Sequence, residues 1–408
     1  MIPSKEILIS PPQWIDPVKN HWKLKSLPPN LCTHQKVTDQ ISRFLDMLQS
    51  VNSPYNPTVY WESPQGKLQK AFVSKIGIYS PESRKTMPNP TQFEGGFKTG
   101  RNIINTHKIG FSLLLFKNKK DKETSYAAVQ RDIKVAQELE NKIPNIQKPL
   151  DTLHWVTRKG TRKIGYICLK QESDLLELVK RQAQNSTSLH IHLSQQRDLQ
   201  QEMIQILKQI SDEGFLYRDV KLENFLVTLY GKLILADFDM CSKELIEPNS
   251  FQGTPASMAP EYLYLILLKN KLQYNPSKEI VNLIVNEKIT VFSLGIEFLR
   301  MNFYAAKISH LHPLTMLPRP GATYADRVCT LKSQWVPYSF RNFLKQKDPT
   351  IPIDYPSYQN PIPKHIDPIP SGNSLIFLIE SMLAEDPRNR PSLAQVALEI
   401  KRLRKKED

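Results

Sequence analysis

Apolar residues recur at helical spacing over two long stretches of the chain. In the first, from Lys122 to Ile143, they form one face of a predicted helix, which Pro144 is expected to end. The second stretch stops at Gly214, a residue suited to the left-handed conformation beyond a helix end. A third segment, VFSLGIEFLRM at 291–301, is apolar nearly all round and predicts a helix buried on every side. The C-terminal part of the chain should therefore be mostly helical.

Strand-like runs lie on both sides of the first helical stretch. Residues 1 to about 90 hold the runs PTVYW and KAFVSKIGIY, separated by Pro, Ser and Asn clusters, and we interpret this region as an N-terminal extension. Beyond Gly214, the runs FLVTLYG and KLILADFD meet at Tyr230 and Gly231 like a hairpin. The Pro-rich stretch 349–370 is predicted to be a loop, and the basic run 401–406 a solvated tail.

Composition narrows the class of protein but not its function. Among 408 residues, 55 Lys and Arg face 40 Asp and Glu, so the surface should attract phosphates, acidic proteins or an anionic membrane face. Four cysteines without CxxC spacing favour a reducing compartment. No signal peptide or 18-residue apolar run is found, so we predict a soluble cytoplasmic protein. Secretion into a host cytosol as an effector and peripheral membrane association are the alternatives.

The chemistry-bearing residues gather in two neighbouring strings. YRDVKLENFLV, followed by ADFD, places Asp219, Lys221, Asn224 and Asp237 around a strand–turn–strand unit. Phosphoryl transfer needs a carboxylate to accept the hydroxyl proton, metal ligands, and cations that neutralise the moving phosphoryl group. Carboxylate and amide oxygens are the hard ligands that magnesium prefers. These four residue types could therefore carry out phosphoryl transfer together.

The two strings closely resemble the eukaryotic-type protein Ser/Thr kinase family. Its catalytic loop reads [HY]RDxKxxN and its metal motif DFG, and the spacings of five residues from Asp219 to Asn224 and thirteen from Asn224 to Asp237 also agree. The resemblance implies an α+β, two-lobed fold that binds ATP with Mg²⁺, or with Mn²⁺ in its place. It makes Asp219 the base, flanked by Arg218 and phosphate-contacting Lys221, and makes Asn224 and Asp237 the metal ligands.

Three later segments extend the resemblance. GTPASMAPE ends at Glu261, 24 residues after Asp237, like the segment that closes the activation loop of the family. TVFSLG resembles the DxWSxG motif, and EDPRNRPS resembles DPxxRPS, whose arginine, Arg390 here, pairs with the glutamate corresponding to Glu261. The expected domains are an extension at 1–90, a small lobe with hinge at 91–172, and a large lobe at 173–408 with insertions near 262–289 and 302–372.

The small lobe is assigned by working backwards along the same resemblance. GFSLLLFK looks like the strand that ends in the phosphate-binding lysine, Lys117, although a solvated lysine would read the same way. Gly95 and Gly100 match two glycines of the nucleotide loop, or mark an ordinary turn. In the following helix, Asp132 takes the place of the glutamate that fixes the lysine, with Glu138 as the competing candidate.

The hinge and a regulatory site complete the assignment. YICLKQESDLLELV looks like the hinge strand, with Leu169 as gatekeeper next to the adenine. Ser250, thirteen residues after Asp237, occupies the place of the activating phosphosite in related kinases, and Arg218 could pair with a phosphate there. An exposed loop serine is the alternative interpretation.

Three positions depart from the pattern of the family. Tyr217 replaces the common histidine, Asp239 replaces the glycine of DFG, and Thr290 replaces the central-helix aspartate that braces the catalytic loop. A side chain at Asp239 removes backbone freedom beside the metal, and Thr290 leaves a weaker hydrogen-bonding anchor. These departures suit an outlying kinase, such as a bacterial effector.

Two other classes of function compete with protein phosphorylation. One is a pseudokinase scaffold, suggested by Asp239 and by the glycine loop, in which Phe97 replaces the second glycine. The other is a kinase fold that transfers AMP or modifies a small molecule, since fold does not dictate chemistry. Protein substrates are the expected partners and nucleic acid is not, while the oligomeric state is left open. The excess of positive charge also predicts stimulation by an inositol polyphosphate, a phosphoinositide or another anionic lipid.

Overall fold

The computed structural model describes residues 122–156, 162–169, 171–185, 189–243, 257–305, 336–352 and 373–404, together with seven strands before residue 117. By its internal contacts the chain divides into two units. The first comprises Met1–Gln137 with Gln147–Lys170, and the second Glu138–Ile146 with Gln171–Asp408. The domain boundaries expected at residues 90 and 172 stay predictions.

One nine-stranded sheet, in the order β1-β2-β3-β4-β5-β6-β7-β9-β8, organises the first unit. Neighbouring strands are antiparallel except β2 and β3, which run parallel. The predicted strand runs PTVYW, KAFVSKIGIY and GFSLLLF fall on strands of this sheet. Its members are β1 Ile15–Asp16, β2 His21–Leu24, β3 Thr58–Glu62, β4 Leu68–Ser74, β5 Gly77–Pro81, β6 Lys98–Ile104, β7 Gly110–Phe116, β8 Asp151–Val156 and β9 Arg162–Leu169.

Helix α2, Lys122–Leu139, is the first predicted helix, and its apolar face is buried as expected. Val129 and Ile133 join Tyr166 and Cys168 of β9 in one hydrophobic cluster. The helix ends at Leu139, four residues before the predicted end. There the amides of residues 142 and 143 both donate to the Leu139 carbonyl in a tighter turn, which terminates the helix ahead of Pro144.

The second unit is mainly helical, in agreement with the sequence. Its helices are α3 Leu175–Asn185, α4 Leu189–Asp212, α5 Pro260–Leu272, α6 Lys278–Ile284, α7 Glu287–Ala305, α9 Tyr338–Lys347, α10 Asn373–Met382 and α11 Leu393–Arg404, with 3₁₀ turns η3 Leu222–Asn224 and η4 Pro387–Asn389. Short strands β10 Ser173–Asp174, β12 Phe225–Val227 and β13 Leu233–Leu235 form one sheet, and β11 Leu216–Tyr217 pairs with β14 Cys241–Ser242. None of the described helices combines the length and the apolar character that crossing a membrane requires.

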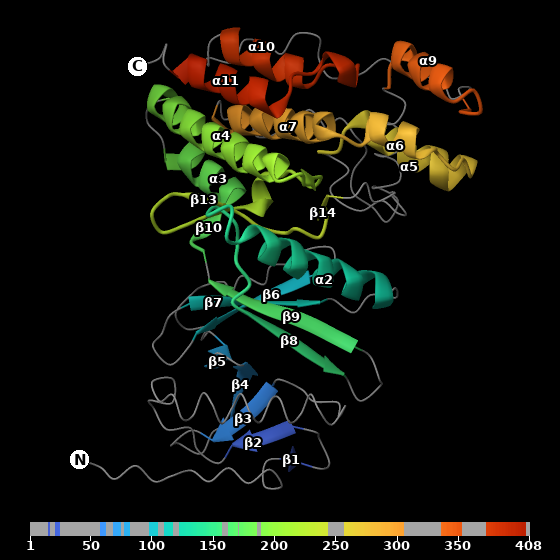
Figure 1. Ribbon diagram of the computed structural model, residues 1–408. Helices are drawn as coiled ribbons and strands as arrows, with labels where there is room; N and C mark the ends of the chain where they lie inside the picture. The colour runs from blue at the N-terminus through green and yellow to red at the C-terminus, as the bar shows by residue number, and fades with distance from the viewer. Residues whose placement is uncertain are drawn as a thin grey trace. The chain divides into compact units, whose positions relative to one another are not determined.

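Helix α7 is the central element of the second unit. It packs against α3, α4 and α10 (Figure 1), and every residue from Ile289 to Leu299 is buried. This confirms the all-round burial predicted from VFSLGIEFLRM. Gly295 sits where α7 meets the end of α10, because a Cβ there would lie 3.0 Å from atoms of Met382 and Leu383. The helix is thus held closely on several sides.

Two glycines take the positions that the sequence assigned to them. Gly214, with φ +79°, follows the end of α4, and the Phe215 amide donates to the Ile210 carbonyl to close the helix. Gly231, with φ +73°, turns the chain between β12 and β13, as the hairpin interpretation expected. The 3₁₀ turn η3 directly precedes β12; it ends at Asn224 and follows Lys221.

Candidate active site

Asn224 ties the predicted catalytic loop together. Its side-chain Nδ2 donates to the Asp219 carbonyl at 2.8 Å, to Asp219 Oδ2 at 3.2 Å and to the Tyr217 hydroxyl at 2.9 Å. A carbonyl and a carboxylate accept hydrogen bonds only, so they orient the amide with its nitrogen toward the loop. The Asn224 Oδ1 is therefore the oxygen that could bind a cation.

Lys221 lies beside the predicted base. Its Nζ is 2.5 Å from Asp219 Oδ2, and the Asp219 side chain is almost fully buried. Burial lowers the pKa of Lys221, but the Asp219 and Asp237 carboxylates outweigh it and raise that pKa above its ordinary value of 10.5. The amine is therefore a permanent cation at neutral pH. The predicted proton acceptor, Asp219, therefore lies next to a positive charge.

Asp237 has a left-handed backbone, with φ +66°. The preceding residue joins it to the loop, since the Ala236 amide donates to the Asn224 carbonyl at 2.9 Å. The sequence raised the concern that Asp239 would need the freedom of glycine. Among the described non-glycine residues, however, positive φ occurs at Asp237 and Gln273 and not at Asp239. Asp237 itself adopts the left-handed geometry, which aspartate tolerates better than most residues.

Tyr217, which replaces the common histidine, links the loop to the Asp237 segment. Its hydroxyl accepts from Asn224 and donates to the Ala236 carbonyl at 2.8 Å. Its ring meets the edge of Phe238 with centroids 6.0 Å apart. Burial, and then the Asp237 and Asp219 carboxylates, raise the pKa of the Tyr217 hydroxyl well above its usual value. The hydroxyl therefore stays protonated and donates the second bond.

Arg218 contacts the chain just beyond Asp237. Its Nε donates to the Met240 carbonyl at 2.9 Å and its Nη2 to Ser242 Oγ at 3.3 Å. The guanidinium also hydrogen-bonds the side chain of Tyr262, and burial, opposed by this guanidinium, raises the pKa of the tyrosine. The predicted pairing of Arg218 with a phosphate at Ser250 stays a prediction, because Ser250 lies outside the described residues.

Helix α7 holds the loop on either side of the predicted base. Thr290 Oγ1 donates to the Tyr217 carbonyl at 2.9 Å, so threonine acts as the anchor that the sequence anticipated. Two turns further along the helix, Glu297 Oε2 accepts from the Leu222 amide at 3.1 Å. Residues 217 and 222 flank the segment that carries Asp219 and Lys221. Both ends of this segment are therefore attached to one helix.

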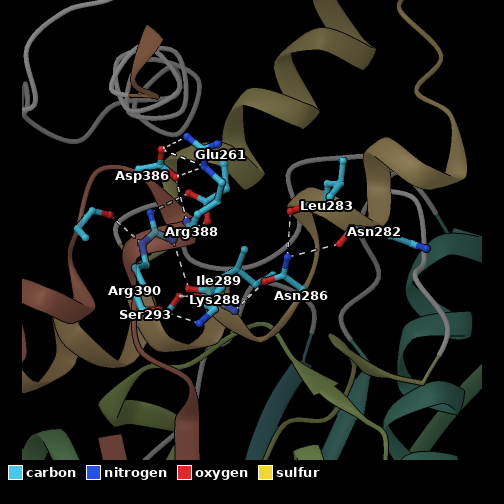
Figure 2. Close-up of polar contacts among 11 residues, drawn as sticks. Glu261, Asn282, Leu283, Asn286, Lys288, Ile289, Ser293, Asp386, Arg388 and Arg390 are labelled. Carbon is cyan, nitrogen blue, oxygen red and sulfur yellow. Dashed lines mark hydrogen bonds and ion pairs between the residues drawn. The ribbon is translucent and has the colours of Figure 1, made fainter. Parts of the chain in front are cut away.

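Glu261 and Arg390 form the buried ion pair that the motifs predicted. Arg390 Nη1 lies 2.6 Å from Glu261 Oε1 and Nη2 lies 3.0 Å from Oε2, with both side chains inaccessible to solvent (Figure 2). Arg390 Nε also donates to the Ala384 carbonyl at 2.9 Å, and the guanidinium lies over the Phe292 ring. The pair joins the first turn of α5 to the segment between α10 and α11.

The structure distinguishes the two candidate acidic residues of α2, of which Asp132 belongs to the first unit and Glu138 to the second. Asp132 is buried and accepts from the Tyr166 hydroxyl at 2.9 Å. Glu138 is exposed and pairs with Lys243. Because the face that carries Asp132 packs inward, it is the better-placed candidate. Lys117, its predicted partner, lies outside the described residues.

The remaining residues predicted for the small lobe lie either in strands of the sheet or outside the described residues. Gly100 lies in β6 opposite Leu114 of β7, and Gly95 is outside the described residues. Leu169 ends β9 opposite Phe111, with 49% of its surface exposed. Their predicted contacts with a nucleotide remain predictions.

Sequence reasoning missed a polar group beneath the loop. Glu297 is fully buried, contacts Arg300 and Ser257, and lies within a helix segment that is mostly apolar. Arg300 also reaches Glu223 in η3 at 3.2 Å. A single glutamate inside VFSLGIEFLRM was the available signal, because buried charges are rare unless they are paired.

The chain is similar to known protein kinases. The family described as Protein kinase domain matches residues 111–400. Protein kinase C-like 1 of Saccharomyces cerevisiae is 45% identical over 65 residues, which are 15% of this chain and 6% of that protein. Serine/threonine-protein kinase TAO1-B of Xenopus laevis is 31% identical over 192 residues, 47% of this chain and 16% of that protein. Serine/threonine-protein kinase 10 of Homo sapiens is 29% identical over 147 residues, which are 35% of this chain and 14% of that protein.

These relatives are much longer proteins, and the chain spans at most 16% of the length of each of the three. The family match covers well over half of the chain and includes the catalytic loop, the Asp237 segment and the Glu261–Arg390 pair. The chain therefore belongs to the protein kinase domain family.

Proposed function

We propose that this chain is an ATP-dependent protein kinase that transfers the γ-phosphate to Ser or Thr of protein substrates. The observation that carries the proposal is the convergence of Asp219, Lys221 and Asn224 in one hydrogen-bonded, largely buried group. A scaffold that binds no nucleotide has no need of these side chains in this arrangement. Membership of the protein kinase family supports the same activity.

In the proposed mechanism, Asp219 accepts the proton of the substrate hydroxyl as that oxygen bonds to the γ-phosphorus of ATP, while the bond from this phosphorus to the β–γ bridging oxygen breaks and ADP leaves. Lys221, cationic at its raised pKa, neutralises charge on the transferred phosphoryl group. The donor set fits magnesium, because Asn224 Oδ1 and the Asp237 carboxylate are hard oxygen ligands. When bound, the metal supplies positive charge at the phosphates.

The altered catalytic-loop tyrosine also has a role in this proposal. Tyr217 joins Asn224 to the Ala236 carbonyl, next to Asp237. A single phenol therefore connects Asn224 to the backbone directly before Asp237. Positioning of reacting groups accounts for most of the catalysis of phosphoryl transfer, so a rigid link of this kind favours an active enzyme.

The test is incubation with labelled ATP, magnesium and a mixed protein extract, followed by mass spectrometry of the modified residues. We expect phosphoserine and phosphothreonine with the wild type and none with Asp219→Asn or Asp237→Asn. Asp219→Asn should still show a rise in melting temperature with magnesium and ATP. AMP adducts, or a phosphorylated small molecule in place of protein, would redirect the function, and absence of both transfer and nucleotide binding would indicate a scaffold.

We also propose that an anionic ligand, an inositol polyphosphate or a phosphoinositide, stimulates the kinase. The net charge of +15 supports this, as does the last turn of α11, where Lys401, Arg402 and Arg404 are exposed. Arg402 and Arg404 already pair with Glu399 and Asp198, so the ligand must compete with those carboxylates. Titration at low salt should raise activity or melting temperature, with salt reversing the effect. Unchanged values at low salt would rule the stimulation out.

Action as an effector in a host cytosol and peripheral membrane attachment stay sequence-based predictions. Vesicles that contain phosphoinositide, compared with free inositol polyphosphate, separate attachment to a membrane from binding of the headgroup alone.

A further inference from the structure

The buried carboxylate of Glu297 receives hydrogen bonds from two separate segments of the second unit. Its Oε2 accepts from the Leu222 amide at 3.1 Å, in the catalytic loop. Its Oε1 accepts from the Ser257 hydroxyl at 2.7 Å, in the segment that leads into α5. These contacts span 75 and 40 residues of sequence. One side chain therefore links two loops to the central helix.

A neighbouring arginine, Arg300, connects the Glu297 carboxylate to a second acidic residue, which lies in the catalytic loop. Arg300, one turn further along α7, donates to Glu297 Oε2 at 2.7 Å and lies 3.2 Å from Glu223 in η3. Arg300 lowers the pKa of Glu223, which outweighs the opposing effect of burial. Glu297 and Arg300 together thus contact the loop through its backbone and through a side chain. The loop is fixed in both position and orientation.

Thr290 and Glu297 hold the two ends of the segment that carries the proposed base. They are seven residues apart on α7, two helical turns, so they project from nearly the same face. One bonds the Tyr217 carbonyl and the other the Leu222 amide. The four residues that lie between these two points include Asp219 and Lys221. Loss of either bond frees one end of the segment that carries the proposed base.

We propose that Glu297 is a positioning residue that couples the catalytic loop to the Ser257 segment, and so sets the placement of the base relative to the segment leading into α5. The inference rests on the proposed kinase function. A displacement of about 1 Å at reacting groups can cost on the order of a hundredfold in rate, so loss of this link should lower turnover. Nucleotide affinity should change little, because none of these bonds involves Asn224 Oδ1 or Asp237.

The kinetic test compares two substitutions at Glu297. Glu297→Met has a similar length but accepts no strong hydrogen bond, and we expect it to lower kcat/KM for protein substrate by about tenfold or more. Glu297→Gln can keep its oxygen toward Leu222 and Arg300 and donate its amide to the Ser257 hydroxyl, which also accepts. It should therefore restore most of the activity. Glu279→Gln, an exposed residue of α6, is the matched control and should leave kcat/KM unchanged.

The coupling itself is tested by a double-mutant cycle. Ser257→Ala alone should lower kcat/KM, but in the Glu297→Met background it should add little, because the bond is already lost. Fully additive effects would overturn the coupling. Wild-type kcat/KM in a folded Glu297→Met protein would overturn the positioning role.

Hydrogen exchange distinguishes failure of this inference from failure of the proposed function. Glu297→Met should speed amide exchange in peptides that cover 217–225 and 257–262, and Glu297→Gln should do so much less. This readout needs no catalysis, so it decides the positioning role even if the wild type transfers no phosphate. Unchanged exchange in both peptides would contradict the inference.

Discussion

The buried Glu261–Arg390 pair permits a quantitative prediction. Glu261→Gln keeps the shape of the side chain but removes the negative charge that faces the Arg390 guanidinium at 2.6 and 3.0 Å. Arg390 stays buried, and besides the amide oxygen of the new side chain its acceptors are the Ala384 and Lys288 carbonyls at 2.9 and 3.3 Å. Neither carbonyl carries a full charge. The substitution therefore leaves a desolvated cation without its counter-ion.

The expected loss follows from the burial of both partners. Breaking a buried pair on one side costs about 3–5 kcal/mol in the free energy of unfolding. Replacing both residues, as Glu261→Met with Arg390→Met, removes both charges at once but leaves two backbone carbonyls with fewer donors. That double variant should lose only about 1–3 kcal/mol, less than the sum of the single losses.

The assay is urea denaturation followed by circular dichroism, which gives the free energy of unfolding of each variant. The control is the exposed Glu279–Lys347 pair, whose charged atoms are 3.8 Å apart. Glu279→Gln should cost no more than about 0.5 kcal/mol, as surface ion pairs usually do. A loss below about 1 kcal/mol for Glu261→Gln, or a double variant that loses the full sum, would refute the reasoning.

Three further outcomes are expected. Thr290→Val removes the donor to the Tyr217 carbonyl and should lower both kcat and the free energy of unfolding, the latter by about 1–3 kcal/mol. Thr290→Ser keeps the bond, and equal kcat in the two variants would count against the anchoring role of this bond. Gly295→Ala should lower the free energy of unfolding, measured by urea denaturation, by about 1–3 kcal/mol, because its new methyl group meets Leu383 at 3.0 Å. An unchanged free energy of unfolding would show that α10 can move to make room for the methyl group. Burial, opposed by Arg300, raises the pKa of Glu297 from 4.5 to about 7. The contribution of Glu297 to the stability of the fold is therefore fully present below pH 4.5 and is lost as pH rises through 7. Because this pKa rises from 4.5 to about 7, the free energy of unfolding of the wild type, relative to that of Glu297→Gln, should fall by about 3 kcal/mol over this range. A pH-independent difference would exclude the raised pKa.

Local patterns in the sequence determined the elements that carry the site. The periodicity of apolar residues located α2 and α4, and a segment that is apolar nearly all round located α7. Glycines at 214 and 231 marked the helix end and the hairpin. Such features depend on neighbours within a few residues, so a sequence displays them directly. The ordered motifs likewise predicted that Asp219 lies beside Asn224 and that Glu261 pairs with Arg390, and both contacts are present. The end of α2 was wrong by four residues, because the turn after Leu139 depends on backbone bonds that periodicity does not reveal.

Apart from the Glu261–Arg390 pair, which the motifs predicted, contacts between distant segments were decided only by the tertiary structure. Asp132 and Glu138 lie on one helix and have the same chemistry, and only packing shows that Asp132 faces Tyr166 while Glu138 faces Lys243. Glu297 appeared in the sequence as one polar residue in an apolar run. Its acceptor role depends on the Leu222 amide, 75 residues away, and a backbone amide leaves no trace in residue identity. The fold alone brings such groups together, because hydrogen bonds require atoms to meet within about 3 Å whatever their separation along the chain.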